Sequence, residues 1–295
     1  MIEANPDSAM ARVKAETLIE SLDWLRQFHD KVIVIKFGGN AMVDEQLQRA
    51  FAQDVSYLRY VGIKPVVVHG GGPQITERLA ELGIESVFRA GMRVTDERSI
   101  PVIRDVLRNQ IGTHLSELIQ DAGAGAKVLS GEDENLFKAV KVQGQSADGP
   151  VDLGFVGEVR SVNPRAVLNA IENSVVPVIS SIAPTADGQL LNVNADLAAA
   201  ALAVAVGAEK LMVLTDVQGL YSDWPNKDSL ISSISAEELK ELLPRLESGM
   251  IPKMQACLEA VEGGVPKAHI IDGRTPHSIL LEVFTKSGVG TQVTR

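Results

Sequence analysis

The sequence contains one cysteine, Cys257, so no disulfide can form within the chain and no second cysteine completes a metal-binding CxxC pair. No stretch approaches eighteen consecutive apolar residues, which argues against a membrane-spanning helix. The N-terminal segment carries the acidic residues Glu3, Asp7 and Glu16 and lacks the continuous apolar run of a secretory signal. We therefore expect a cytoplasmic protein that has no membrane partner.

Four motifs of common enzymes are also missing from the sequence, namely Walker A, GxGxxG, HExxH and GxSxG. Their absence argues against a P-loop kinase, a dinucleotide-dependent dehydrogenase and a zinc protease. The run His69-Gly70-Gly71-Gly72 resembles the oxyanion loop of esterases. A hydrolase remains a weak alternative, because the loop comes without a nucleophile turn.

Positive charge is scarce, since 38 acidic residues stand against 28 lysines and arginines and give a net charge of -10. A chain of this charge repels nucleic acid and an anionic bilayer surface, so we expect neither as a partner. Apolar residues make up 45% of the sequence, as in ordinary globular proteins. An anionic ligand would require basic groups gathered in one place.

Apolar runs that end in glycine alternate with amphipathic segments along the chain. Residues 31–37 and 65–69 are typical of strands buried on both faces, and residues 47–61 have helical spacing. Further strands are expected at 175–180, 210–215 and 268–271. The alternation predicts an α/β fold, a three-layer α/β/α sandwich with a mainly parallel central sheet. Short runs at 127–129, 136–142 and 155–162 suggest inserted hairpins.

Residues 10–29 have the spacing of one amphipathic helix, with Val13, Leu18 and Leu22 on its apolar face. This face could pack on its own domain or against another subunit, and the sequence does not favour either. We divide the chain into an N-terminal helical arm at 1–30 and two lobes at 31–185 and 186–295.

Two glycine turns follow adjacent predicted strands, at Gly38-Gly39 and at Gly70-Gly71-Gly72. The carboxyl ends of parallel strands meet at one edge of a sheet, where open α/β proteins bind ligands. Glycine lets backbone N–H groups approach an anion, and a following helix adds the positive end of its dipole. The turns therefore predict a site for phosphate or carboxylate groups.

Two lysines stand where local structure alone would not favour them. Lys36 lies in an apolar strand, where an unpaired ammonium group would cost several kcal/mol. Lys253 lies at the start of a predicted helix, a poor place for a cation. Asp196, by contrast, follows the N-cap Asn194 in the first turn of a predicted helix, where the helix dipole favours its charge.

At these positions the sequence resembles the acetylglutamate kinase branch of the amino acid kinase family. The motifs that carry the resemblance are Lys36 to Met42 (KFGGNAM), His69 to Ile75 (HGGGPQI), Gly91 to Asp96 (GMRVTD), Asn192 to Asp196 (NVNAD), Thr215 to Val217 (TDV) and Gly249 to Met254 (GMIPKM). The resemblance covers about residue 22 to the C-terminus. It implies that Lys36 and Lys253 stabilise a migrating phosphoryl group and that Asp196 holds both lysines.

The resemblance also assigns binding residues. Arg93 would grip the substrate's α-carboxylate, with Asn192 and the amides of Gly71 and Gly72 completing the site for N-acetyl-L-glutamate. The residues expected on the ATP side are Gly38, Gly39, Asp216, Gly249, Met250 and Ile251. Mg²⁺ would be held by the ATP phosphates and water, with no dedicated set of metal-binding side chains.

The chain is further similar to the arginine-inhibited members of the family. Residues 269–273, Glu282 and the segment 288–291 carry this similarity, and Trp24 stands where a tyrosine is expected. It implies an arginine site that includes Trp24, His269, Glu282 and Gly290. It also implies a homo-oligomer, a hexamer built as a trimer of dimers through the N-terminal helix.

Two alternatives stay open at this point. The chain could be another kinase of the same family, acting on glutamate, aspartate, carbamate or a nucleoside monophosphate. It could instead be a non-catalytic sensor of nucleotide or arginine. The GMRVTD and NVNAD motifs favour the acetylated amino acid, and the presence of both lysines with Asp196 favours catalysis.

Overall fold

The computed structural model describes residues 6–89, 91–146, 149–286 and 288–295. Its largest element is an eight-stranded sheet that is parallel except where β15 meets β16. In spatial order the strands are β14 (Ser233–Ser235), β16 (Thr291–Thr294), β15 (Lys267–Asp272), β11 (Lys210–Thr215), β1 (Val32–Phe37), β2 (Lys64–His69), β8 (Val176–Ser180) and β5 (Ala126–Ser130).

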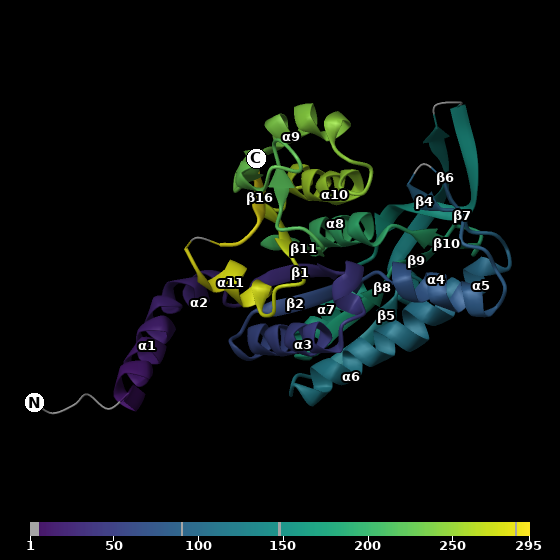
Figure 1. Cartoon of the computed structure of the whole chain (residues 1–295). Coiled ribbons are helices and arrows are strands. Elements are labelled where there is room, and N and C mark those ends of the chain that lie inside the picture. The colour runs from purple at the N-terminus through teal and green to yellow at the C-terminus, as the bar shows by residue number, and fades with distance from the viewer. Residues whose placement is uncertain (1–5, 90, 147–148, 287) are drawn as a thin grey trace, which may run out of the picture.

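Helices cover both faces of this sheet (Figure 1). Successive side chains of β1 point to opposite faces, so Val34 packs in one core while Ile33 and Ile35 pack in the other. One face is covered by α7 (Arg165–Glu172), α8 (Ala195–Ala205) and α10 (Ile251–Glu262). The other is covered by α3 (Glu45–Tyr60), α5 (Ser99–Asp105), α6 (Thr113–Asp121) and α11 (Ser278–Phe284). The predicted three-layer sandwich is confirmed.

A second, four-stranded sheet stands beside the main one, in the order β6-β7-β10-β9. It contains the hairpin of β6 (Phe137–Ser146) and β7 (Gly149–Val162), together with β9 (Ile182–Pro184) and β10 (Leu190–Val193). The expected hairpin is thus confirmed for two of its three runs. The third run, residues 127–129, is a strand as expected, but its place in a hairpin is wrong, because it belongs to β5, which pairs in parallel with β8 at the edge of the main sheet.

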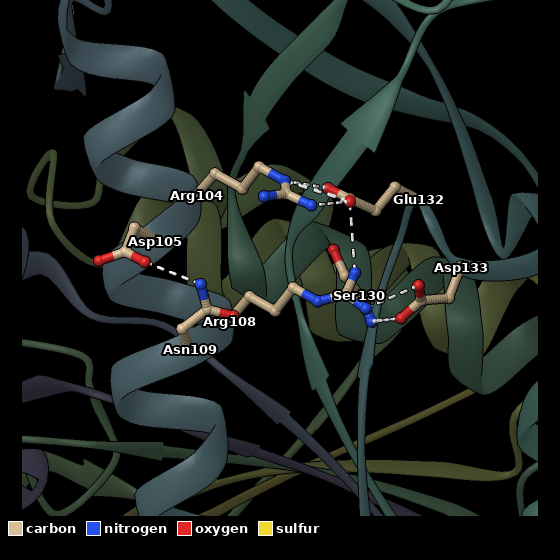
Figure 2. A network of polar contacts seen from close by, with 7 residues as sticks. All are labelled: Arg104, Asp105, Arg108, Asn109, Ser130, Glu132 and Asp133. Atoms are coloured by element: carbon tan, nitrogen blue, oxygen red, sulfur yellow. Dashed lines mark hydrogen bonds and ion pairs between the residues drawn. The ribbon is translucent and has the colours of Figure 1, made fainter.

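The helical segment from Ser99 to Asp121 contains a stretch of π-helix. Between α5 and α6 lies η2, a π-helical stretch at Val106–Gly112. Figure 2 shows how Arg104 and Arg108 of this region reach the segment after β5: Arg104 binds Glu132, and Arg108 lies 2.9 Å from Asp133. These ion pairs fix η2 against the carboxyl end of β5.

The N-terminal segment forms two helices, α1 (Pro6–Glu20) and α2 (Leu22–Phe28), and not the single helix expected. Figure 1 shows α1 extending away from the body of the molecule. Val13 and Leu18 are more than half exposed, whereas Phe28 is buried. Packing of the apolar face on its own domain is therefore wrong for α1 and correct at Phe28.

The remaining elements are short and connect the larger ones. They are η1 (Gly39–Met42), α4 (Gly72–Glu81), β3 (Phe88–Arg89), β4 (Met92–Arg93), η3 (Asp133–Asn135), β12 (Leu220–Tyr221), η4 (Lys227–Ser229), β13 (Leu230–Ile231), α9 (Ala236–Leu242) and η5 (Leu243–Arg245). No helix in the described ranges is long and apolar enough to span a bilayer. The proposed boundaries fall before β1 and between β9 and β10, and the division into an arm and two lobes stays a prediction.

Candidate active site

The predicted glycine turns meet at the carboxyl ends of β1 and β2, beside the N-termini of α4 and α8. They border a cleft of about 730 Å³. Its lining includes Gly38, Gly39, Gly71, Gly72, Lys36, Arg93, Asn192 and Asp196. First-turn amides of a helix have no acceptor within the helix, so two helix starts make this edge attractive to anions.

Lys36 and Lys253 meet on the carboxylate of Asp196. The Nζ of Lys36 lies 2.9 Å from Oδ1, and the Nζ of Lys253 donates to Oδ2 at 3.2 Å. The side chains of Lys36 and Asp196 are almost fully buried, while that of Lys253 is 22% exposed. The structure thus places one ammonium group on each oxygen of a single carboxylate beside the cleft.

Local structure fixes these three side chains. Lys36 is near the end of a central strand and points to the α8 face, away from solvent. Asn194 caps α8 by accepting hydrogen bonds from the amides of Asp196 and Leu197. Burial alone would raise the pKa of Asp196, but the charges of Lys36 and Lys253 outweigh it and hold that pKa below 3.8. The acid is therefore ionised at neutral pH.

Arg93 presents a buried cation to the same cleft. Its guanidinium donates to the Ser86 hydroxyl at 2.6 Å, to the Thr76 hydroxyl at 2.7 Å and to the Gly72 carbonyl at 3.0 Å. Its Cζ lies 4.7 Å from the centre of the Phe88 ring. All these partners are neutral, and Arg93 forms no ion pair with any described residue. A carboxylate ligand would supply the missing charge.

Asn192 and the second glycine turn line the same cleft as Arg93. The side chain of Asn192 donates to the Thr95 hydroxyl at 3.3 Å, which orients its amide at the cleft wall. Gly71 is the residue before α4, and a Cβ there would collide with Leu107 and Ile111. Glycine at this position lets the backbone lie between the hydrophobic core and the cleft.

Asp216 holds the first glycine turn through hydrogen bonds from Asn40. Its carboxylate accepts the backbone N–H of Asn40 at 2.9 Å and the Asn40 side chain at 3.2 Å. Gly39 has φ of +75°, and a Cβ there would lie 2.7 Å from Oδ1 of Asp216. Asp216 therefore fixes the turn that would face the nucleotide, and its own contact with ATP stays a prediction.

The other predicted ATP residues lie outside the lining of the cleft. Gly249, Met250 and Ile251 lead into α10, two residues before Lys253, and Gly249 and Ile251 are exposed. They share the Lys253 side of the site. Their role in binding nucleotide also stays a prediction.

The four residues predicted to bind arginine line a different cavity, of about 280 Å³, between α2, α11 and β15. Trp24, His269, Glu282 and Gly290 all border it. Glu282 is buried, and it lies 3.0 Å from Nζ of Lys210 and 2.6 Å from Nδ1 of His269. Burial alone would raise the pKa of Glu282, but His269 and Lys210 lower it to about 2.

Sequence reasoning missed several residues that shape these sites. Lys210 opens an apolar strand and is 4% exposed, so the signal that identified Lys36 could also have identified it. Ser86 and Thr76 orient Arg93, but nothing in their local pattern marks them. His69 was noted only as the first residue of a glycine-rich motif, and it is fully buried beside the second glycine turn.

Comparison with known sequences agrees with the geometry. The sequence profile of the amino acid kinase family matches residues 31–272. The chain is 62% identical over 290 residues to the acetylglutamate kinase of Leifsonia xyli, a match covering 97% of this chain and 96% of the relative. It is 59% identical over 293 residues to the acetylglutamate kinase of Clavibacter michiganensis, covering 98% and 96% of the two chains.

Solved structures share the architecture at lower identity. An N-acetylglutamate synthase from Neisseria gonorrhoeae, complexed with coenzyme A and L-arginine, is 25% identical with a TM-score of 0.77 and is matched over 95% of this chain and 65% of its own. This chain thus spans about two thirds of that protein. A carbamate kinase from Giardia lamblia bound to AMP-PNP is 19% identical with a TM-score of 0.62, which shows the fold alone; the match covers 90% of this chain and 98% of that one.

Proposed function

The chain belongs to the amino acid kinase family, and we infer that it transfers the γ-phosphoryl group of ATP to the γ-carboxylate of N-acetyl-L-glutamate. The product is N-acetylglutamyl 5-phosphate, an intermediate in arginine biosynthesis. The curated relatives that share more than half of its residues over nearly the whole chain are acetylglutamate kinases.

The observation that carries this function is the Lys36–Asp196–Lys253 cluster beside the cleft. Negative charge spreads over the phosphoryl oxygens during transfer, and two fixed ammonium groups can stabilise it. The attacking carboxylate has an ordinary pKa near 4.3 and is already ionised at neutral pH. Catalysis therefore needs no general base, and the cluster contains none.

Magnesium would enter with the nucleotide. Both oxygens of Asp196 contact lysines, and the Asp216 carboxylate accepts two hydrogen bonds from Asn40, so these acids are engaged with the protein. Hydrated Mg²⁺ bound to ATP phosphates fits such a site, with the side chains supplying positive charge beside it. The ion would neutralise phosphate charge, while the lysines orient and stabilise the transferred group.

A coupled hydroxylamine assay tests the reaction directly, because acyl phosphates form hydroxamates. Purified full-length chain with ATP and Mg²⁺ should give hydroxamate with N-acetyl-L-glutamate and much less with glutamate or aspartate. Asp196→Asn serves as the inactive control, and carbamate and UMP are tested separately for ADP release. Preference for another acceptor, or no turnover with any, would reject the assignment.

We further propose that arginine inhibits the enzyme from the second cavity. Glu282 supplies a buried carboxylate, and Nε2 of His269 is buried with no hydrogen-bond partner in the described part of the chain. The Nδ1 of His269 faces Glu282, so Nε2 can accept a hydrogen bond from a guanidinium. The synthase structure with L-arginine gives this proposal additional support.

Inhibition can be tested with a residue that lines the second cavity and not the catalytic cleft. His269→Leu removes the Nε2 acceptor and should raise the arginine concentration for half-inhibition about tenfold, the value of one charge-assisted hydrogen bond. Turnover without arginine should be retained. Leu281→Ala on the exposed side of α11 is the matched control. Unchanged inhibition of His269→Leu would exclude this cavity as the effector site.

The exposed face of α1 is the proposed contact between subunits of a cytoplasmic hexamer. Val13, Leu18 and Ile19 are 56%, 64% and 72% exposed, a large apolar surface for one helix. Analytical ultracentrifugation of the full chain should show a hexamer, and Leu18→Glu with Ile19→Glu should give dimers. Deletion of residues 1–28 should also abolish arginine inhibition. A hexamer that survives the double substitution would place the contact elsewhere.

A further inference from the structure

His69 is a fully buried histidine at the end of β2, directly before the second glycine turn. Its Nδ1 lies 3.0 Å from the carbonyl oxygen of Gly70. A carbonyl can only accept, so Nδ1 must carry the proton in this contact. The other ring nitrogen, Nε2, has no hydrogen-bond partner among the described residues.

The surroundings keep this ring neutral. Burial lowers the pKa of His69 to about 4, so the ring is uncharged at neutral pH. A protonated ring would place a second N–H where the structure provides no acceptor. One tautomer, with hydrogen on Nδ1, therefore satisfies the contact to Gly70.

This hydrogen bond determines the direction of the next amide. A trans peptide is planar, and its C=O and N–H point to opposite sides. His69 is paired in register with Phe37, so its side chain points to the same face of the sheet, the α3 face. The hydrogen bond from the ring therefore draws the Gly70 carbonyl toward that face. The N–H of Gly71 then points toward the α8 face, where Lys36 meets Asp196 at the cleft.

The π-helical segment η2, which covers the His69 imidazole, is held in place. A Cβ at Gly112 of η2 would lie 3.4 Å from Nε2 of His69, so the π-helical turn covers the ring. Arg108 of this turn and Arg104 of the preceding helix α5 form ion pairs with the segment after β5 (Figure 2). Such a fixed cover leaves the ring little freedom to turn away from Gly70.

We propose that His69 is a positioning residue for phosphoryl transfer, holding the Gly70–Gly71 peptide so that the Gly71 N–H points into the cleft. The inference rests on the proposed kinase function and adds a residue to it. His69 does not line the cleft itself. It acts through the amide, which the reaction needs at a fixed position to stabilise developing charge.

Two substitutions of nearly equal shape separate this role from packing. His69→Asn keeps an N–H donor at the position of Nδ1, and His69→Leu does not. We expect His69→Leu to lower kcat about 10- to 100-fold with little change in the KM for ATP, and His69→Asn to recover most of the loss. Ser180→Ala, which alters the neighbouring buried position in register with His69, should leave kcat unchanged.

Equal losses in the Asn and Leu variants, or an unchanged kcat in His69→Leu, would overturn the proposal. A structural measurement on the unmodified protein tests it independently of the kinase assignment. In ¹⁵N NMR of the five histidines, the His69 signal should show a protonated Nδ1 and an unprotonated Nε2 from pH 8 to pH 6. Protonation on Nε2 in this range would also overturn it, whatever reaction the protein catalyses.

Discussion

The Nζ of Lys36 lies 2.9 Å from Oδ1 of Asp196, in an ion pair that joins a strand of the first half of the chain to a helix of the second. Both side chains are almost fully removed from water, so neither charge is stable without the other. Because Asp196 also binds Lys253, one carboxylate sets the positions of both cations.

Asp196→Asn should lower kcat by about a hundredfold or more, because loss of one preorganised electrostatic contact has effects of that size and here two cations lose their anchor. The amide preserves shape, so Michaelis constants should change much less. Steady-state kinetics in the hydroxamate assay measures both, with Asp152→Asn on an exposed strand as control. A kcat near that of the parent would mean that the lysines do not depend on Asp196.

Arg93→Lys should raise the KM for N-acetyl-L-glutamate about 10- to 100-fold, while the KM for ATP stays near the parent value. Lysine keeps the positive charge but loses the guanidinium fork. The fork can bond Ser86, Thr76 and Gly72 and still have N–H groups left for a substrate carboxylate. The size corresponds to one charge-assisted hydrogen bond of about 1.5–3 kcal/mol. A selective rise in the KM for ATP would instead put Arg93 on the nucleotide side.

Local sequence signals were sufficient for the layers of the fold and for the central residues of the site. Apolar runs closed by glycine correctly indicated the main strands, and the cost of a buried ammonium led to Lys36. The same cost applies to Lys210, which was overlooked because it stands at the start of its strand. Its burial depends on Phe28, whose ring centre lies 5.3 Å away, and on Glu282 of α11.

Other features depend on contacts that no local pattern encodes. β5 lies at the edge of the main sheet, next to β8, the strand that follows α7. The short apolar run at 127–129 does not indicate which strand it will pair with. The π-helical turn η2 contains the same kinds of side chains as an ordinary α-helix, so its sequence does not distinguish the two. Ser86 and Thr76 are common surface residue types, and only their meeting at Arg93 gives them a role.

Gly39→Ala should weaken ATP binding, seen as a raised KM for ATP. Gly39 has φ of +75°, which costs an alanine about 1–2 kcal/mol, and the new methyl group would also press on Asp216 and shift the turn. Gly83→Ala is a matched control, because Gly83 has φ of +68° but open space around it. Both variants should show a similar decrease in the free energy of unfolding measured with urea. Only Gly39→Ala should change the KM for ATP. Equal KM values for ATP in Gly39→Ala and Gly83→Ala would mean that the Gly39 turn does not bind the nucleotide.

Glu282→Gln should destabilise the fold in a pH-dependent way. Contacts with His269 and Lys210 lower the pKa of Glu282 from 4.5 to about 2, so the folded state favours the carboxylate. Its stabilisation, at most about 3 kcal/mol, is complete above pH 4.5 and is lost as the pH falls toward 2. Urea unfolding at pH 7, 5, 4 and 3 should therefore show a gap between parent and variant that narrows below pH 4.5. Glu241→Gln, at an exposed position, should show no such narrowing, and a gap of constant size for Glu282→Gln would mean that the carboxylate is not held by these partners.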